Sequence, residues 1–278
     1  MRLRTLPVST AGVAAACAVG YREAGFRWGA AAICLVFAVL CQIASNFANE
    51  YYDFRAGLDR PGRSGPRRGV TEGDLSAEAM KRATYLTLFL ALVSGLSLIT
   101  WGGFWLIPVG ALIAIGAICY SAGPYPLSHH GLGEGAVFIF FGLIPVNFTY
   151  FLTTGQWSLT ALLVSVSIGL MGANVLIVNN YRDADEDREV GKRTLATIFG
   201  RTPIRLLYLL NGIMAAGVSF LASNGSHNLL IASAVYLALH LALWTRMKLN
   251  EGDDASRLNP LLGMTAVLML FYAALLFI

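Results

Sequence analysis

The sequence predicts an all-α, polytopic membrane protein that forms one integral-membrane domain over residues 1–278. Composition is the first reason: 56% of the residues are hydrophobic, only 13% are charged, and the mean hydropathy is +0.62. Such a composition is typical of chains that reside in a bilayer, and it excludes an ordinary soluble domain. The second reason is that apolar runs recur along the chain, each near the length of about 20 residues that crosses a hydrocarbon core of about 30 Å.

Nine apolar runs predict nine transmembrane helices. In order, they cover residues 6–21, 28–46, 83–101, 104–119, 136–154, 159–178, 203–222, 229–245 and 260–278. A short segment joins the first two runs, whereas a long polar segment at residues 47–82 follows the second. The fourth run is short and is separated from the third only by Gly102 and Gly103. Polar segments at residues 120–135 and 179–202 separate the middle runs.

The basic residues set the orientation of this nine-helix arrangement. If the N-terminus is cytoplasmic, 18 of the 20 lysines and arginines fall on the cytoplasmic side, and only Arg22 and Arg27 lie outside. This asymmetry follows the positive-inside rule, and a span count wrong by one would destroy it because every later loop would change sides. The alternative that residues 1–20 form a cleaved signal peptide would leave eight spans and an external N-terminus. The sequence therefore predicts a multi-pass protein of the cell inner (plasma) membrane with a cytoplasmic N-terminus.

A first acidic cluster follows the second apolar run, on the predicted cytoplasmic side. Four polar residues there are spaced i, i+3, i+4 and i+7 and so share one stripe of a helix: Asn46, Asn49, Glu50 and Asp53. Gly57 can end that helix, because glycine readily adopts the left-handed conformation found at helix C-termini. The chain can then fold back and bring Asp59 towards Asp53.

A second acidic cluster follows the sixth apolar run. Asn180, Asp183 and Asp187 share one stripe if the helix continues past the apolar residues. Asp185 would point away from that stripe by about 140°. The two clusters are therefore predicted to oppose each other across one cavity at the cytoplasmic ends of their helices.

Both acidic clusters run into basic tails, at residues 60–69 and 188–194. Carboxylates beside cations suit a Mg²⁺-bridged diphosphate, because Mg²⁺ prefers hard oxygen ligands and phosphates need positive charge. A plainer interpretation is that these are capping and solvated residues with cations that only anchor the chain at the membrane surface. That interpretation explains the number of cations but not their place beside two clusters of the same pattern. The sequence therefore favours a membrane enzyme that acts on a diphosphate.

At these residues the chain resembles the UbiA superfamily of intramembrane aromatic prenyltransferases. The family's first motif corresponds to Asn49-x-x-x-Asp53, with the last acid at Asp59. Its second motif corresponds to Asp183-x-x-x-Asp187. Further segments resemble the branch that makes menaquinone by prenylating 1,4-dihydroxy-2-naphthoate: residues 4–7, 65–69, 120–127, 131–134, 179–183 and 191–195. The resemblance covers essentially the whole chain, and the family fold agrees with nine helices.

The resemblance also implies a role for each motif residue. Five residues would hold two Mg²⁺ ions: Asn49, Asp53, Asp59, Asp183 and Asp187. Four residues would bind the substrate, with Tyr120 beside the diphosphate and the others on it: Arg63, Arg67, Lys192 and Tyr120. The residues expected to be catalytic are Asp53, Asp183, Asp187 and Lys192. Glu50 stands where many family members carry Asp, so it is expected to be a secondary metal ligand or a shaping residue.

The implied reaction transfers a polyprenyl group from a polyprenyl diphosphate to 1,4-dihydroxy-2-naphthoate, with loss of CO₂ and diphosphate, and gives demethylmenaquinol. Stabilising the diphosphate leaving group lets the allylic substrate ionise. Aromatic faces stabilise the resulting allylic cation, and exclusion of water prevents its quenching. Membrane lipid, into which the prenyl tail extends, is an expected partner, and nucleic acid is not. Prenyl chain length and oligomeric state stay open.

Two alternatives remain beside this assignment. One is prenylation of another aromatic acceptor, such as 4-hydroxybenzoate. The other, from a different class, is a cation-coupled secondary transporter. Transport sites usually lie near the bilayer midplane, whereas the acids of this chain follow the apolar runs, and this difference favours the enzyme.

The polar segment at residues 120–134 is predicted to be cytoplasmic and could cap the site. It contains His129 and His130. We expect these to be exposed loop imidazoles; the alternative is that they receive the carboxylate of the acceptor.

Overall fold

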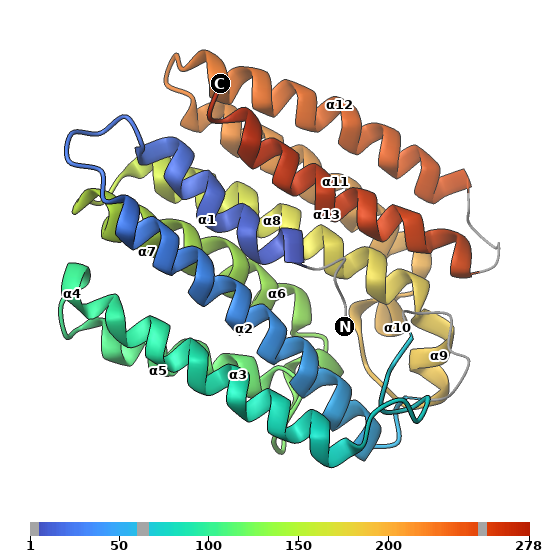
Figure 1. Ribbon diagram of the computed structural model, residues 1–278. Helices are drawn as coiled ribbons and strands as arrows, with labels where there is room; N and C mark the ends of the chain where they lie inside the picture. The colour runs from blue at the N-terminus through green and yellow to red at the C-terminus, as the bar shows by residue number, and fades with distance from the viewer. Residues whose placement is uncertain (1–5, 60–66, 250–254) are drawn as a thin grey trace.

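The computed structural model describes residues 6–59, 67–249 and 255–278. All regular elements within these three ranges are helices, which run back and forth along one common direction as a bundle (Figure 1). The all-α prediction is therefore confirmed for the described chain.

Long helices follow one another along the chain with short helical turns between them. The long ones are α1 (Leu6–Gly20), α2 (Trp28–Arg55), α3 (Ala77–Ser97), α5 (Leu106–Cys119), α7 (Ile144–Thr154), α8 (Leu159–Arg182), α11 (Arg201–Ala222), α12 (His227–Leu249) and α13 (Asn259–Leu275). The short ones are α4 (Ile99–Gly102), η2 (Leu127–His129), α6 (Gly133–Val137), the π-helical η3 (Phe138–Leu143), α9 (Ala184–Glu189), α10 (Leu195–Phe199) and η4 (Ala255–Leu258).

Six helical segments of the described chain are long and apolar enough to cross a membrane. They are Trp28–Arg55, Ala77–Gly102, Gly133–Thr154, Leu159–Arg182, Arg201–Ala222 and His227–Leu249. Three further apolar helices, α1, α5 and α13, are shorter, at 15, 14 and 17 residues. Each predicted apolar run overlaps one of these segments, so the order and placement of the helices agree with the sequence, while length and composition support a crossing for the first six.

Two helical segments differ in detail from the predicted runs. α2 continues to Arg55, well past the predicted end at residue 46, so the first acidic cluster is helical. The predicted helix at residues 136–154 is α6, η3 and α7 in succession, with a widened π-helical turn in its middle. Pro145 follows that turn and has no backbone N–H to donate to it, which favours a departure from regular α-helical hydrogen bonding there.

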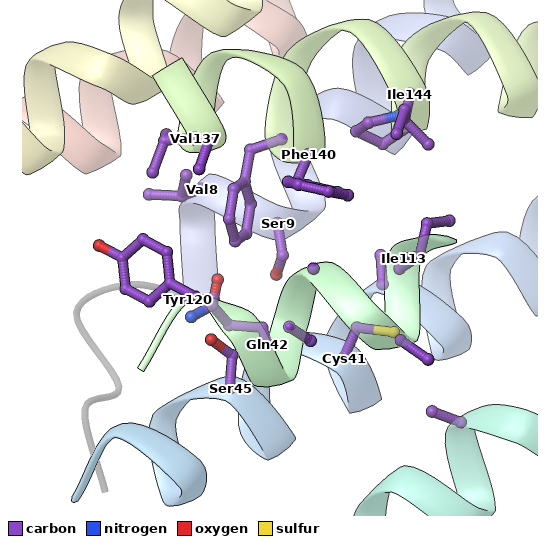
Figure 2. Close-up of a pocket in the computed structure, with 18 of the residues that line it drawn as sticks. Val8, Ser9, Cys41, Gln42, Ser45, Ile113, Tyr120, Val137, Phe140 and Ile144 are labelled. Atoms are coloured by element: carbon purple, nitrogen blue, oxygen red, sulfur yellow. The ribbon is translucent and has the colours of Figure 1, made fainter. Parts of the chain in front are cut away.

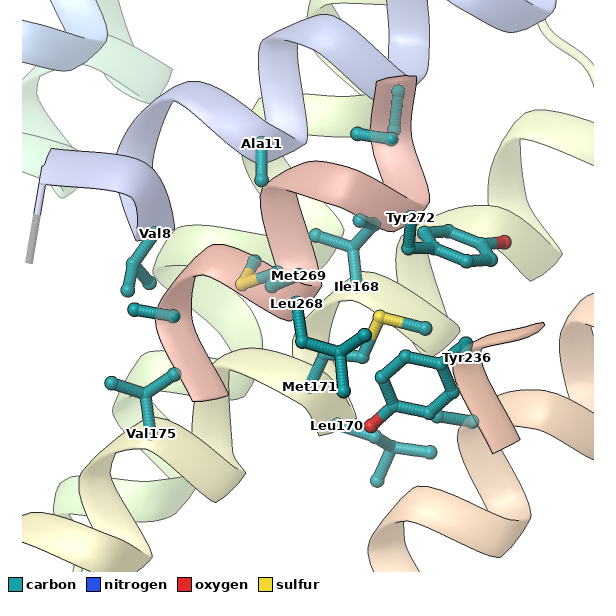
Figure 3. Packing of buried hydrophobic residues seen from close by; sticks show 14 of the residues in the cluster. Val8, Ala11, Ile168, Leu170, Met171, Val175, Tyr236, Leu268, Met269 and Tyr272 are labelled. Atoms are coloured by element: carbon teal, nitrogen blue, oxygen red, sulfur yellow. The ribbon is translucent and has the colours of Figure 1, made fainter. Parts of the chain in front are cut away.

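α8 is the central helix of the bundle and packs against α1, α6, η3, α7, α11 and α13. Close approach to η3 depends on glycine, because a Cβ atom on Gly142 would lie 2.3 Å from the Cα of Gly169. Small residues allow helix backbones to approach in this way inside membranes. Elsewhere along α8, Ile168 and Met171 pack against Met269 of α13 (Figure 3).

The segment that joins α1 to α2, which includes Arg27, lies at the end of the bundle opposite α9 and α10 (Figure 1). The backbone N–H of Arg27 donates to Thr153 O at 2.8 Å. Its guanidinium donates to Trp101 O and Leu152 O, each at 3.4 Å. These carbonyls lie in the last turns of α4 and α7, where a cation is favourable. An aromatic group continues the closure, with Trp105 packed against Phe148, Phe151 and Trp157. We call Arg27 and these aromatic residues the far-end closure.

Candidate active site

A cavity of about 690 Å³ lies inside the bundle and is lined mainly by residues of α1, α2, α3, α5, α6, η3, α7 and α8. Most of its lining is apolar, and Figure 2 shows Val137 and Phe140 facing Cys41 of α2 across it. Along α2 the lining extends from Cys34 to Asn49, which corresponds to about 22 Å at 1.5 Å per residue. The cavity is therefore long enough to hold an extended apolar chain.

The end of the cavity nearest α9 is polar, and we call its lining residues the polar mouth. They are Asn49, Tyr120, Glu134, Asn179, Asn180, Asp183 and Lys192. Asn49 belongs to the first acidic cluster and Asp183 to the second. Both clusters thus contribute to one cavity, the first through Asn46 and Asn49 and the second through Asn180 and Asp183, whereas the carboxylates of Asp53, Asp59 and Asp187 are not among its lining residues.

The first acidic cluster lies in the last turns of α2, and its four polar residues are buried: Asn46, Asn49, Glu50 and Asp53. The helix ends in a Schellman turn, in which Gly57 N–H donates to Phe54 O and Leu58 N–H donates to Asp53 O, at 3.1 and 2.9 Å. Gly57 has the left-handed φ of +70° that this turn requires. The chain therefore reverses after α2, as predicted, and returns Asp59 to the cluster.

Arg68 joins the acidic residues of the first cluster. Its guanidinium donates to Asn49 Oδ1 at 3.0 Å and lies 3.3 Å from Asp53 Oδ2 and 3.2 Å from Asp59 Oδ2. Arg68 is only 2% exposed. A buried guanidinium between two carboxylates offsets their mutual repulsion and fixes their orientation. The resemblance implied diphosphate binding by Arg67 and assigned no role to Arg68, which the structure places among the acids.

The other basic residues predicted on this side do not join the cluster within the described chain. Arg67 is exposed and pairs with Asp74 at 2.7 Å, a hydrogen-bonded contact that raises the pKa of the Arg67 guanidinium. Arg63 lies outside the described residues. Glu50 has a shaping role, since its Oε1 accepts from Val70 N–H at 3.1 Å and so holds the segment that carries Arg68.

The second acidic cluster is divided between two helices. α8 ends at Arg182, and α9 begins after Asp183, so the helix does not continue unbroken as expected. Asp183 and Asp187 are nevertheless both buried, whereas Asp185 is exposed and pairs with Arg188 and Arg201 outside. The relative order that helical spacing predicts for the three acids is therefore observed.

A second buried arginine holds Asp183. The guanidinium of Arg182 donates to both carboxylate oxygens of Asp183, at 2.6 and 2.8 Å. It also donates to Asn179 Oδ1 at 3.0 Å and to Asn259 Oδ1 at 2.9 Å. This fork-to-fork pairing fixes the plane of the carboxylate. Sequence reasoning missed Arg182; the available signal was an arginine directly beside a motif acid.

Lys192 is placed by the turn that ends α9. This is again a Schellman turn, with Gly191 N–H donating to Arg188 O at 3.2 Å and Lys192 N–H donating to Asp187 O at 2.8 Å. The ammonium of Lys192 lies 3.6 Å from Asp187 Oδ1. Thr197 Oγ1 donates to Lys192 O at 3.0 Å and ties this segment to α10. Lys192 therefore reaches the polar mouth from a fixed backbone.

The segment between α5 and α6 contacts both acidic clusters. Asn49 donates to Ser121 Oγ at 3.0 Å, and His129 Nε2 lies 3.4 Å from Asp53 Oδ1. On the other side, Arg193 N–H donates to His129 O at 3.2 Å. The expectation of an exposed imidazole is therefore wrong for His129. His130 instead stacks on Tyr125, at 3.7 Å between ring centroids.

The donors at the polar mouth fit a Mg²⁺ ion that is shared with a phosphate ligand. Within the described chain no three His, Cys, Asp or Glu side chains lie together in a way that could hold a metal ion by themselves. Mg²⁺ in phosphate-transfer sites is usually held by one or two carboxylates, with substrate phosphates completing the shell. Asp183 and Asn49 provide hard oxygens of that kind at the mouth. Asp53 and Asp187 add negative charge at helix C-terminal ends, which favours cations.

Comparisons with known proteins agree with this geometry. The model of the UbiA prenyltransferase family matches residues 8–276. The chain is 31% identical to a 1,4-dihydroxy-2-naphthoate octaprenyltransferase of Haemophilus influenzae, over 97% of this chain and 90% of that protein. It is 35% identical to the protein of the same description in Escherichia coli, over 74% of this chain and 68% of that protein. Its fold matches that of a UbiA homolog from Archaeoglobus fulgidus bound to DMAPP and Mg²⁺, with a TM-score of 0.68, 17% identity and coverage of 99% and 98% of the two chains.

Proposed function

This chain belongs to the UbiA prenyltransferase family, and we propose that it transfers a polyprenyl group from polyprenyl diphosphate to 1,4-dihydroxy-2-naphthoate, with release of CO₂ and diphosphate. The observation that carries the proposal is the cavity, in which a long apolar body ends in a polar mouth shared by both acidic clusters. The names of the relatives in Haemophilus influenzae and Escherichia coli support the acceptor. The product is demethylmenaquinol, which places the reaction in menaquinone formation.

The diphosphate of the donor binds at the polar mouth in this proposal. Lys192 provides the first cationic contact, because it lines the mouth and lies 3.6 Å from the carboxylate of Asp187. A diphosphate carries more charge than that carboxylate and accepts several hydrogen bonds. Arg67 would have to leave Asp74 to reach the same place. Tyr120 lies beside the diphosphate as a further lining residue of the mouth.

The metal ligands we propose are Asn49, Asp53, Asp59, Asp183 and Asp187. The A. fulgidus homolog, whose structure is described as bound to DMAPP and Mg²⁺, supports the choice of metal. When bound, Mg²⁺ would supply positive charge against the charge that develops on the leaving diphosphate. Arg68 and Arg182 hold Asp53 and Asp183 in place for that role.

The apolar body of the cavity receives the prenyl chain and excludes water from the reacting carbon. Exclusion of water matters because water would otherwise react with the allylic cation. The ring of Phe140, which lines the cavity (Figure 2), offers an aromatic face of the kind that attracts cations.

We further propose that the single domain crosses the inner membrane nine times, with its N-terminus and polar mouth on the cytoplasmic side. The 18-to-2 distribution of basic residues supports this orientation. The short helices α1, α5 and α13 would cover only about 21–26 Å of a core of about 30 Å. Flanking residues or local thinning of the bilayer accommodate such a mismatch at modest cost.

The test is an assay of purified protein with Mg²⁺, a polyprenyl diphosphate and each candidate acceptor, with products identified by mass. We expect 1,4-dihydroxy-2-naphthoate to yield demethylmenaquinol and CO₂, and chelation of the metal to abolish turnover. We expect 4-hydroxybenzoate to be a poor acceptor, because a site shaped for two fused rings would hold one ring loosely and misalign its reacting carbon.

Two results would refute parts of the proposal. Efficient prenylation of 4-hydroxybenzoate without CO₂ release would overturn the acceptor and leave the family membership intact. No product with any aromatic acceptor, together with ion flux in proteoliposomes, would favour the transporter.

A further inference from the structure

Glu134 is a carboxylate at the polar mouth that the proposed chemistry has not used. It lies in the first turn of α6, is 7% exposed and lines the cavity. Its Oε1 accepts a hydrogen bond from Asn180 Nδ2 at 2.8 Å. Its Oε2 is buried and has no hydrogen-bond partner. Oε1 is thus held by Asn180, and Oε2 remains available to accept a hydrogen bond from a ligand.

The surroundings of Glu134 indicate which ligand supplies that proton. A buried carboxylate oxygen without a partner is costly, so a site that keeps one usually has a ligand for it. The diphosphate cannot be this ligand, since it is an acceptor and would be repelled. The second substrate, by contrast, is an aromatic ring with hydroxyl donors. Tyr120, Asn180 and the cationic Lys192 line the same mouth as Glu134, so its surroundings suit an acceptor that carries both hydroxyl groups and a carboxylate.

We propose that Glu134 binds the hydroxyl of the aromatic acceptor that is adjacent to its carboxylate and takes the proton of that hydroxyl during prenyl transfer. The inference rests on the proposed function and assigns the acceptor to the α6 side of the mouth. Asn180 orients the carboxylate, and the Oε2 atom faces the acceptor. Glu134 is then a catalytic residue in direct contact with substrate.

The step balances without any further reagent. The ring carbon that bears the carboxylate forms a bond to the first carbon of the prenyl group, and diphosphate leaves with the electron pair of the broken C–O bond. The neighbouring hydroxyl gives its proton to Glu134 and becomes a ketone. The resulting β-keto carboxylate loses CO₂, and the electrons of that C–C bond restore the aromatic ring. The oxygen takes the proton back from Glu134, which ends unchanged.

The variant Glu134→Gln tests the proposal, because it keeps the size of the side chain and an oxygen for Asn180 but puts a donor where Oε2 accepts. We expect kcat with 1,4-dihydroxy-2-naphthoate to fall by about 100-fold or more, the scale of losing a general base. Binding of polyprenyl diphosphate with Mg²⁺ should be unchanged. The matched control is Glu78→Gln, which removes the same charge from an exposed position at the start of α3 and should leave turnover unchanged.

A pH profile separates a proton acceptor from a structural residue. The deficit of Glu134→Gln should shrink as pH rises, because the acceptor hydroxyl then ionises in solution and no longer needs a base. An acceptor methylated on that hydroxyl should be equally poor with both proteins. If the glutamine variant does not fold, Glu134→Asp takes its place, with an intermediate loss expected.

Several outcomes would overturn the inference. They are full activity in Glu134→Gln, a deficit that is constant across pH, or loss of polyprenyl diphosphate binding. Failure of the unaltered protein to prenylate 1,4-dihydroxy-2-naphthoate would instead refute the proposed function, so the two failures are distinguishable.

Discussion

Each acidic cluster has an arginine built into it, and the two arginines are both only 2% exposed. Arg68 lies between Asp53 and Asp59, and Arg182 donates hydrogen bonds to both carboxylate oxygens of Asp183. Buried carboxylates without such partners would repel one another and shift towards their protonated forms. The arginines therefore hold the acids in fixed orientations before any substrate arrives.

Replacement of a buried motif acid by its amide is expected to abolish most turnover. Asp53→Asn and Asp183→Asn should each lower the rate by at least about 100-fold, the scale of removing a principal stabiliser of leaving-group charge. Asp185→Asn is the matched control, because Asp185 is exposed and pairs with Arg188 and Arg201. Initial rates in membranes, with gel filtration in detergent to verify folding, measure the effect. Equal damage from Asp185→Asn would refute this assignment of the acids.

Helical spacing in the sequence predicts which of the acids are buried, but it does not choose between Arg67 and Arg68. The acids lie on or beside helices, where the period of the structure determines which side chains share a face. The two arginines lie in a segment of turns whose direction is set by the contact between Glu50 and Val70. No local period encodes that contact, so the sequence identifies a basic run and the structure identifies its buried member.

At the scale of elements, α2 and α9 end in the same way. In each, the backbone carbonyl of an acid three residues before the cap, Asp53 or Asp187, accepts from the N–H of the residue directly after a glycine with positive φ. The turn after α2 returns Asp59 to Arg68 in the first cluster, and the turn after α9 brings Lys192 to the polar mouth. The Asn-and-Asp pattern that occurs twice in the sequence is thus followed each time by a Schellman turn.

Hydropathy locates the helices but underestimates the length of α2, which carries part of the site. α2 runs to Arg55 because its polar stripe faces buried partners, whereas a count of apolar residues stops at residue 46. The π-helical η3 was also missed, because Pro145 alone does not distinguish a π-helical turn from other departures from the α-helix, and the close approach of Gly142 to Gly169 of α8 is a long-range contact.

A glycine of α5 allows a test of whether the cavity discriminates between prenyl chains of different length. Gly110 lines the cavity, and a Cβ atom there would meet no heavy atom within 4 Å. We expect Gly110→Phe to fold and to project its ring into the apolar body, lowering turnover with long polyprenyl diphosphates at least about tenfold relative to a short one. The measurement is kcat/KM across a series of chain lengths. A loss of one to two methylene contacts already changes discrimination by about tenfold.

Gly217 of α11 provides the matched control for this experiment. It is also free of neighbours within 4 Å but is exposed and does not line the cavity. Gly217→Phe should therefore leave the length preference unchanged. A uniform loss with donors of every length in Gly110→Phe would contradict the expected role of the cavity body.

At the scale of the whole molecule, most of the fold could be predicted because a bilayer permits few solutions. Backbone groups in lipid must be satisfied within the segment, so long apolar runs become helices. The order of those runs then determines the bundle that is observed. The cavity could not be predicted in the same way, because its shape depends on which helices stand apart, and side-chain packing decides that.

Orientation in the membrane is a prediction for the whole chain. Reporter fusions after Ala56 and after Gly200 should both report a cytoplasmic location, and a fusion after Ile278 should report an external one. The reason is the 18-to-2 distribution of basic residues in the nine-span arrangement. An external signal from either of the first two sites would refute the arrangement.

The far-end closure has a mechanical consequence for the bundle. Arg27 joins the last turns of α4 and α7 through three carbonyls, and Trp105 packs against its aromatic neighbours beside them. The segment between α1 and α2 is thereby pinned to α4 and α7, so these helix ends are held against splaying apart when the opposite end of the bundle binds its substrates.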